Sequence, residues 1–170
     1  EPQNLHALGA VESLIVTPLA FKSQADRLAN LHRDQGMTVH VVTTEQVYNE
    51  FSSGAQDVTA IKFFAKMFYD RAGGNVALMP KSLLLFGGGT FDPKGIVSGA
   101  NYIPTYQDFY SENQIAALVM DDYFGMLDDS ESIADGDMLD IGVGRMLISS
   151  TQVAKEQVDK VEIYMKNTNN

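Results

Sequence analysis

The stretch from Ser82 to Asn101 reads SLLLFGGGTFDPKGIVSGAN, and it decides the fold. Residues 82–86 form a short apolar run after Pro80, which is typical of a strand buried on both faces of a parallel sheet. The triple glycine at residues 87–89 follows directly. Glycine permits positive φ and lets other groups approach the backbone closely, so we expect a sharp turn there. Because α/β proteins carry their crevices at the carboxyl ends of strands, we expect a functional edge near these glycines.

Upstream of this stretch, strand and helix patterns alternate. Residues 13–18, SLIVTP, predict a first strand, and residues 37–44, MTVHVVTT, predict a second. Apolar residues at helical spacing between them predict a helix with Ser23 as its cap and Gly36 as its stop. A strand, a helix and a strand of this length imply a right-handed parallel unit.

Two further segments separate this unit from the central strand. Residues 45–54, EQVYNEFSSG, predict a turn of helix and a loop. Asp57 is placed to cap a stronger helix, in which apolar residues recur on one side, and residues 73–74, both glycine, end it.

Downstream, residues 92–110 form a long aromatic loop, too long to be a simple connection. Residues 114–121 predict a strand that ends at Asp121 and Asp122, and residues 140–147 predict a last strand. A final helix begins at Thr151. The fold class is therefore α/β, with a mostly parallel sheet flanked by helices in three layers, as in flavodoxin-like proteins, and residues 1–170 form a single domain.

Composition excludes several functions. The chain has 170 residues, of which 45% are hydrophobic, and this suits one core. A net charge of -10 argues against nucleic acid or an anionic membrane surface as a partner. No apolar window approaches the length of a membrane span, and we expect no membrane insertion by this segment. Cysteine is absent, which rules out a disulfide, a thiolate metal site and a thiol nucleophile within these residues.

Two motifs could carry chemistry at strand ends. The run GGGTFDPKG could cradle a phosphate, but it has neither the lysine position of a P-loop nor the GxGxxG spacing with a helix directly behind it. Asp121 and Asp122 could hold a metal or act as acid and base; capping and turn formation is the alternative. Adjacent residues of a strand point to opposite faces, so at most one of the two faces a crevice.

Other polar residues give weaker patterns. The acidic run from residue 128 to residue 140 could bind calcium, but it lacks the glycine and glutamate spacing of a calcium loop, and we favour a solvated acidic loop. His6, His32 and His40 share no spacing for a metal or a triad. Ser98 lies outside any GxSxG motif. No catalytic constellation is visible in the sequence.

A family resemblance accounts for this absence. The ordered segments are ADRLANLHRDQG, TVHVVTTEQVYNEFSSG, LLLFGGGTFD, IPTYQ, DDYFG and GVGRMLISSTQVAKEQVDKVEIY. Together, over residues 13–166, they resemble the amino-terminal subdomain of the gingipain-like cysteine peptidases. Because of QVYNEFSSG and FDPKG, the chain is most similar to the branch of the cell-surface sortase of type IX secretion.

The resemblance implies a caspase-like fold of two subdomains, with the histidine and cysteine of the catalytic dyad in the second. Residues 1–170 would then be the non-catalytic amino-terminal subdomain, and none of them receives a catalytic, cofactor-binding or metal-binding role. Gly87, Asp121 and Arg145 correspond to recurring family positions, with a structural role or a role at the junction between subdomains. Calcium sites occur in gingipains, but their ligands cannot be assigned to Asp135 or Asp137.

The resemblance also implies a function for the whole enzyme. It would be a cysteine endopeptidase or sortase that processes the carboxyl-terminal secretion signals of type IX cargo proteins, extracellular or at the outer-membrane surface. The partners of this segment would be the missing carboxyl-terminal catalytic subdomain and, through the parent enzyme, the cargo; alone, the segment would be inactive. One alternative is a freestanding flavodoxin-like ligand-binding or interaction module that uses a crevice at Gly87. Another is a metal hydrolase built on Asp121 and Asp122.

Overall fold

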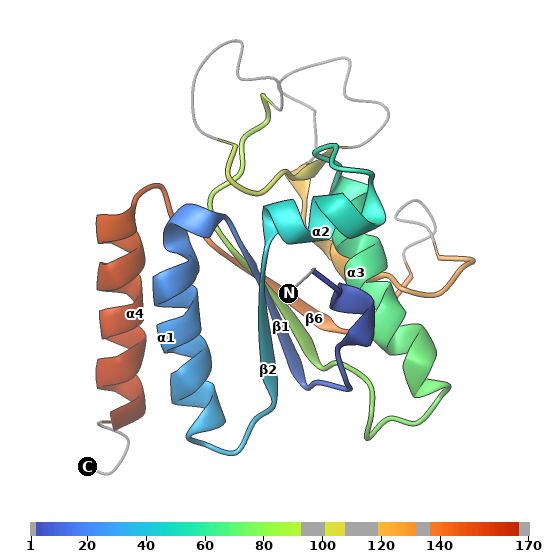
Figure 1. Cartoon of the computed structure of the whole chain (residues 1–170), viewed down its shortest axis with the longest axis horizontal. Helices are drawn as coiled ribbons and strands as arrows, with labels where there is room; N and C mark the ends of the chain where they lie inside the picture. The colour runs from blue at the N-terminus through green and yellow to red at the C-terminus, as the bar shows by residue number, and fades with distance from the viewer. Residues whose placement is uncertain (1–2, 93–100, 108–118, 132–136, 167–170) are drawn as a thin grey trace.

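The computed structural model describes residues 3–92, 101–107, 119–131 and 137–166. Its main sheet has four parallel strands in the order β2-β1-β3-β6 (Figure 1). These strands are β1 (Ser13–Thr17), β2 (Val39–Thr43), β3 (Ser82–Phe86) and β6 (Gly142–Met146). Helices cover both faces of the sheet, so the predicted three-layer α/β class is confirmed.

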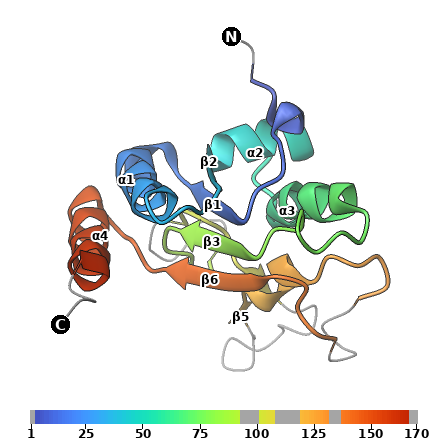
Figure 2. The same ribbon diagram turned by 90° about the horizontal axis from the view of Figure 1, so that it is seen from below.

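The two faces of the sheet carry separate cores (Figure 2). On one face lie α1 (Lys22–Arg33) and α4 (Thr151–Lys166), which pack over Ile15 and Phe86. On the other lie α2 (Thr44–Phe51) and α3 (Val58–Ala72), which pack over Leu14, Val16 and Leu85. Side chains of β1 alternate between the two cores, and all five of its residues are buried. This explains why β1 and β3 read as unbroken apolar runs.

Short elements lie around the sheet: η1 (Leu5–Ala7), η2 (Leu19–Phe21), η3 (Asp122–Gly125), β4 (Tyr106–Gln107) and β5 (Val119–Met120). β4 and β5 pair antiparallel in a separate two-stranded sheet. The strand predicted over residues 114–121 is present in its described part as β5, which ends just before Asp121, but it pairs with β4 and does not join the main sheet. Residues 114–118, and most of the loop predicted over residues 92–110, lie outside the described residues.

Helix ends test the predicted caps. Asp57 does cap α3, since its carboxylate accepts a hydrogen bond from the Thr59 amide at 2.8 Å, and Gly73 ends that helix with φ of 55°. The Ser23 cap is wrong: η2 leads directly into α1, and Phe21 holds the N-cap position without a side-chain bond. A full helix, α2, replaces the turn predicted after residue 45.

The first residues of α2 explain why the sequence predicts only one turn of helix where the structure has a longer one. Thr43 is both the last residue of β2 and the N-cap of α2. Its side chain accepts from the Gln46 amide, while the Gln46 side chain accepts from the Thr43 amide at 2.9 Å. This capping box lets a helix begin without any intervening loop.

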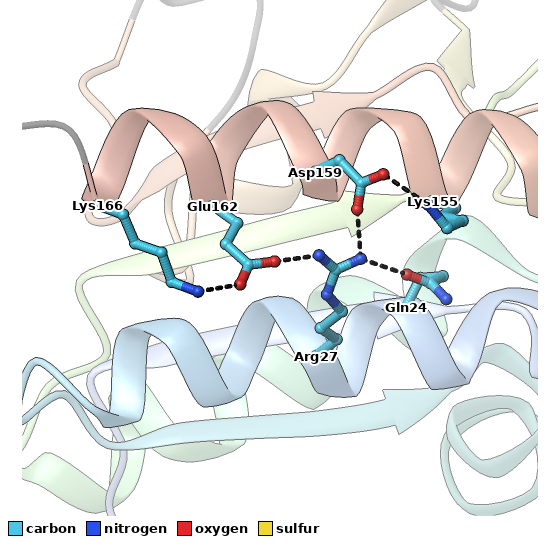
Figure 3. Close-up of polar contacts among 6 residues, drawn as sticks. All are labelled: Gln24, Arg27, Lys155, Asp159, Glu162 and Lys166. Carbon is cyan, nitrogen blue, oxygen red and sulfur yellow. Dashed lines mark hydrogen bonds and ion pairs between the residues drawn. The ribbon is translucent and has the colours of Figure 1, made fainter.

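A network of charged side chains ties α4 to α1 on the surface (Figure 3). Arg27 of α1 donates to Asp159 at 2.6 Å and to Glu162, both on α4. Lys155 and Lys166 pair with the same two carboxylates from within α4. Because α4 buries few side chains, chiefly Ala154 and Val158, we infer that this network helps to hold it in place.

We expect Arg27→Met to loosen α4 slightly, lowering the melting temperature by roughly 1–2 °C, since partly exposed pairs contribute little. The difference from the wild type should shrink in 0.5 M salt, because salt screens exposed charges. Thermal unfolding at low and high salt measures both effects. Lys22→Met is the matched control, since its partner, Asp26, lies on the same helix. An equal effect of the two substitutions would show that the network does not hold α4.

Within the residues that the structure describes, no helix is both long and apolar enough to cross a membrane.

Candidate functional site at the carboxyl edge of the sheet

Arg145, near the carboxyl end of β6, is the most highly bonded side chain at this edge. Its Nε and Nη2 atoms donate to the two carboxylate oxygens of Asp121, at 2.8 and 2.7 Å. Nη1 donates to the carbonyls of Gly87 and Ile103, at 3.1 and 2.9 Å, and Nη2 donates to the carbonyl of Pro104 at 3.2 Å. Only 7% of the side chain is exposed. All five donors of the guanidinium therefore have partners inside the protein.

These contacts join segments that are far apart in the sequence. Gly87 follows β3, Ile103 and Pro104 precede β4, and Asp121 follows β5. A buried guanidinium needs a paired carboxylate, and planar two-point pairing is the strongest arrangement. The structure thus brings together Gly87, Asp121 and Arg145, the three positions that the family resemblance indicates, in one cluster that we call the Arg145 junction.

The triple glycine allows close packing at this junction. A Cβ atom on Gly89 would lie 2.6 Å from Thr105 Cγ2 and 2.7 Å from the Ile103 carbonyl oxygen. One on Gly87 would lie 3.0 Å from Ile103 Cγ1. The expected close approach is therefore confirmed. The expected positive φ is not, because the described glycines with positive φ lie at residues 36, 54, 73 and 74.

The crevice expected at Gly87 is filled by the protein itself. The Ile103 side chain is completely buried against this glycine. At Gly88, the amide donates to the Ile148 carbonyl, and the carbonyl accepts from Tyr102 and Ile103. The backbone at Gly87 is therefore used for packing, and the open space lies beside the next glycines, in a hollow of about 480 Å³ lined by Gly88, Gly89 and Thr90.

The acidic pair after β5 divides between two environments. Both oxygens of Asp121 are bound by Arg145, whereas Asp122 is exposed and begins η3. The Asp121 side chain makes no cap bond to η3, but its carbonyl accepts from the Phe124 amide at 3.1 Å, so the predicted turn forms without the predicted side-chain cap. Since the two carboxylates do not converge, this pair does not form a metal or acid–base site.

A second cluster brings together part of the acidic run. Carboxylate oxygens of Asp128, Glu131 and Asp140 lie within 4.8 Å of one another. The Tyr69 hydroxyl of α3 donates to Asp128 at 3.1 Å and to Asp140 at 3.0 Å. Backbone amides complete the set, with Leu127 donating to Asp140 at 2.7 Å and Asp128 donating to Glu131 at 3.0 Å.

The acidic run is therefore not simply solvated. Lys66 of α3 pairs with Asp129 at 3.1 Å and donates to the Leu127 carbonyl at 2.6 Å, so α3 supplies the cation that the run itself lacks. Oxygen ligands of this kind suit a hard cation such as calcium, but calcium takes six to eight of them. The three carboxylates already accept bonds from the protein, and Asp135 lies outside the described residues. Calcium ligands are therefore not assigned.

Burial, together with the nearby carboxylates of Asp140 and Asp128, raises the pKa of Glu131, while the Asp128 amide opposes the rise. A pKa raised on folding adds stability below the unfolded value, about 4.3, and that stability is lost as pH rises through the folded value. We expect Glu131→Gln to raise the melting temperature at pH 7 by roughly 1–2 °C, with the gain vanishing near pH 4. Thermal unfolding across this pH range measures it.

The control for this prediction is Glu156→Gln, which removes the same charge from an exposed position on α4. It should not reproduce the pH dependence. If the Glu131→Gln protein were no more stable than the wild type at pH 7, the raised pKa of Glu131 would be contradicted.

The three histidines lie in separate places. His6 Nε2 lies 3.8 Å from a Glu50 oxygen, and His40 Nε2 lies 3.1 Å from the Gly9 carbonyl. His32 lies on α1 beside a groove over the sheet. The three rings therefore lie apart, each beside different residues, and Ser98 lies outside the described residues.

Comparisons with known proteins show a matching family and similar solved structures. A sequence profile described as peptidase family C25 matches residues 6–170. No protein with a curated description matches the chain. The chain is similar to the crystal structure of dimeric latent PorU from Porphyromonas gingivalis, with 37% sequence identity and a TM-score of 0.82. That match covers 95% of this chain and 16% of the PorU chain.

A structure described as "Structure of Protease" is also similar, with a TM-score of 0.63, 20% identity, and coverage of 91% of this chain and 28% of that one. At this identity the match supports the fold alone. The resemblance to the PorU branch, predicted from QVYNEFSSG and FDPKG, is confirmed by the first match.

Proposed function

The chain belongs to peptidase family C25, the gingipain family, and we propose that residues 1–170 form the amino-terminal, non-catalytic subdomain of a cysteine endopeptidase or sortase. The observation that carries this proposal is that 95% of the chain aligns with only 16% of the PorU chain. A family that depends on a thiolate needs a cysteine, and this chain has none. The catalytic residues would therefore be supplied by another part of a larger enzyme.

The Arg145 junction supports a bracing role. Its carboxylate and guanidinium bind each other, and its remaining donors bind backbone carbonyls, so these groups are not free to act on a substrate. In this proposal the junction fixes the loops at the carboxyl edge of the sheet, where they form one wall of the contact with the catalytic subdomain.

The position of α4 supports the proposal that the catalytic subdomain is a unit separate from this four-stranded sheet. α1 connects β1 to β2, toward one edge of the sheet, and β6 lies at the opposite edge. α4 packs on the same face as α1 (Figure 2). If the chain continued through α4 to a further strand beside β6, that crossover would have the opposite hand to the crossover from β1 through α1 to β2. Left-handed crossovers of this kind are rare.

The exposed side of α4 offers apolar surface for such a contact. Ile163 is 60% exposed and Tyr164 is 74% exposed. In the whole enzyme, a thiolate paired with histidine would attack a peptide carbonyl, and water or an amine on surface lipopolysaccharide would resolve the acyl-enzyme. The substrates proposed by resemblance are the carboxyl-terminal signals of type IX cargo, at the outer-membrane surface or outside the cell.

Peptidase assays test the proposal directly. The purified 170-residue chain should hydrolyse no peptide, whereas the parent protein, produced from the natural reading frame, should do so and lose activity with iodoacetamide. The 170-residue chain mixed with the separately produced remainder should form a stable complex by size-exclusion chromatography. Cleavage by the 170-residue chain alone, or a parent that is active without any cysteine, would overturn it.

A further inference from the structure

A hollow of about 220 Å³ lies at the amino edge of the sheet, the edge opposite the Arg145 junction. Residues 8–10, which lead into β1, line one side of it, and Leu78, which precedes β3, lines another. Phe68, Arg71 and Ala72, from the last turns of α3, form the remaining wall. An apolar cavity of about 150 Å³ holds one benzene molecule, so this hollow has the volume for a compact apolar group.

The walls of the hollow are mainly apolar. Phe68 and Ala72 are buried, so the hollow reaches down to the core of this face. Leu8 is half-buried and Leu78 is 45% exposed, so these two side chains lie nearer to the solvent. Small-molecule sites typically combine apolar walls of this kind with a few placed polar groups.

Arg71 is the one polar side chain among the residues that line the hollow. Its Nη1 donates to the Leu8 carbonyl at 3.5 Å, which is long for a hydrogen bond. Although the chain has 22 acidic residues, no carboxylate in its described part pairs with Arg71. The adjacent Asp70 pairs with Lys66 at 3.0 Å. A guanidinium in this position suits a ligand that brings its own carboxylate.

Two backbone carbonyls of the wall are already engaged. The Leu8 carbonyl accepts from Arg71, and the Gly9 carbonyl lies 3.1 Å from His40 Nε2. A ligand that donates hydrogen bonds would have to compete for these two acceptors. A ligand that accepts them meets the guanidinium of Arg71 without such competition.

We propose that this hollow binds a small free carboxylic acid, with its carboxylate paired to Arg71 and its apolar tail against Phe68, Ala72 and Leu78. A carboxylate accepts two parallel hydrogen bonds from a guanidinium, which fixes the orientation of the ligand. Because Arg71 is exposed, the ion pair adds little strength, and burial of the tail supplies most of the affinity. This site does not depend on the proposed peptidase function.

Titration by NMR tests the site on the whole 170-residue chain. The probe is phenylpropanoate, and its matched controls are phenylpropanamide, which lacks the charge, and acetate, which lacks the tail. Amide signals of residues 8–10 and 68–72 should shift with the acid and saturate, with a dissociation constant on the order of 1 mM. Phenylpropanamide should bind roughly two- to fivefold more weakly, and salt should reduce this difference. Acetate should not saturate in the same range.

Two pairs of variants separate recognition from nonspecific attraction. Arg71→Gln should abolish the preference for the acid over the amide. Its control, Arg33→Gln, removes the same charge from an exposed position at the same edge but on the opposite face, and should keep the preference. Leu78→Asp should weaken binding of the acid, whereas Val76→Asp, in the same connection but outside the lining, should not.

Several results would overturn the inference. These are signals that do not saturate, equal binding of acid and amide to the wild type, acetate binding as tightly as phenylpropanoate, or equal losses within either pair of variants. None of these results bears on the proposed function, because that proposal is tested by the activity of the longer parent protein.

Discussion

Arg145→Met is expected to lower the free energy of unfolding by about 3–5 kcal/mol, the usual cost of removing one partner from a buried ion pair. The substitution keeps an apolar stem but leaves Asp121 without its cation and the carbonyls of Gly87 and Ile103 without donors. Each unmet buried acceptor adds to the loss. Urea unfolding followed by circular dichroism measures it, with the midpoint and the slope analysed separately.

The matched control is Arg71→Met, because Arg71 is exposed on α3 and makes a single long bond of 3.5 Å to the Leu8 carbonyl. It should change the stability by about 0.5 kcal/mol or less. Equal destabilisation by the two substitutions would mean that the junction does not hold the fold together.

A double-mutant cycle separates the ion pair from the carbonyl contacts. Asp121→Leu alone leaves a buried cation, whereas Asp121→Leu combined with Arg145→Met removes both charges. We expect the double variant to be less destabilised than the sum of the two single variants, with a coupling energy of about 0.5–3 kcal/mol. A sum that is simply additive would show that Arg145 acts only through the Gly87, Ile103 and Pro104 carbonyls.

The layers of the fold were predictable because the burial of a strand is visible in its own sequence as a run of apolar residues. β1 and β3 contact helices on both faces, so their sequences are unbroken apolar runs. Asp57 and Gly73 act within one turn of the helix that they cap or end, so their roles are visible in the sequence. Thr43 was missed as a cap because it also completes a β-branched strand, and one residue served two elements.

The Arg145 junction was only half predictable. The positions of Gly87, Asp121 and Arg145 came from the family resemblance, but nothing in the sequence pairs Arg145 with a carboxylate 24 residues earlier. The acidic run was misjudged for the same reason. Its counterparts, Lys66 and Tyr69, lie about sixty to seventy residues upstream, on a helix that only the fold brings alongside.

Of the two reasons expected for the triple glycine, close approach by other groups was right and positive φ was wrong. Glycine is needed there because residues 103–105 pack directly against the backbone. A contact of this kind leaves no trace near the glycines in the sequence, since the crowding groups come from a segment some fourteen or more residues away. Glycine runs after strands therefore indicate either a turn or a close contact, and the sequence alone does not separate the two.

Gly89→Ala tests this close contact, and we expect it to cost about 1–3 kcal/mol, the usual penalty for adding a methyl group to a packed site. The new Cβ would lie 2.6 Å from Thr105 Cγ2 and 2.7 Å from the Ile103 carbonyl oxygen. Gly144→Ala is the matched control, because a Cβ at that position in β6 meets nothing within 4 Å. Urea unfolding of both variants should show a loss for the first and a change within about 0.5 kcal/mol for the second.

A second substitution identifies the source of the strain. Thr105→Ser removes the methyl group that the new Cβ would meet but leaves the Ile103 carbonyl in place, so it should restore only part of the stability of Gly89→Ala. The residual loss is attributable to backbone crowding, which side-chain changes do not relieve. If Gly89→Ala were as stable as Gly144→Ala, residues 103–105 would have to move aside freely. Since Arg145 holds the carbonyls of Ile103 and Pro104, such freedom would also argue against a rigid Arg145 junction.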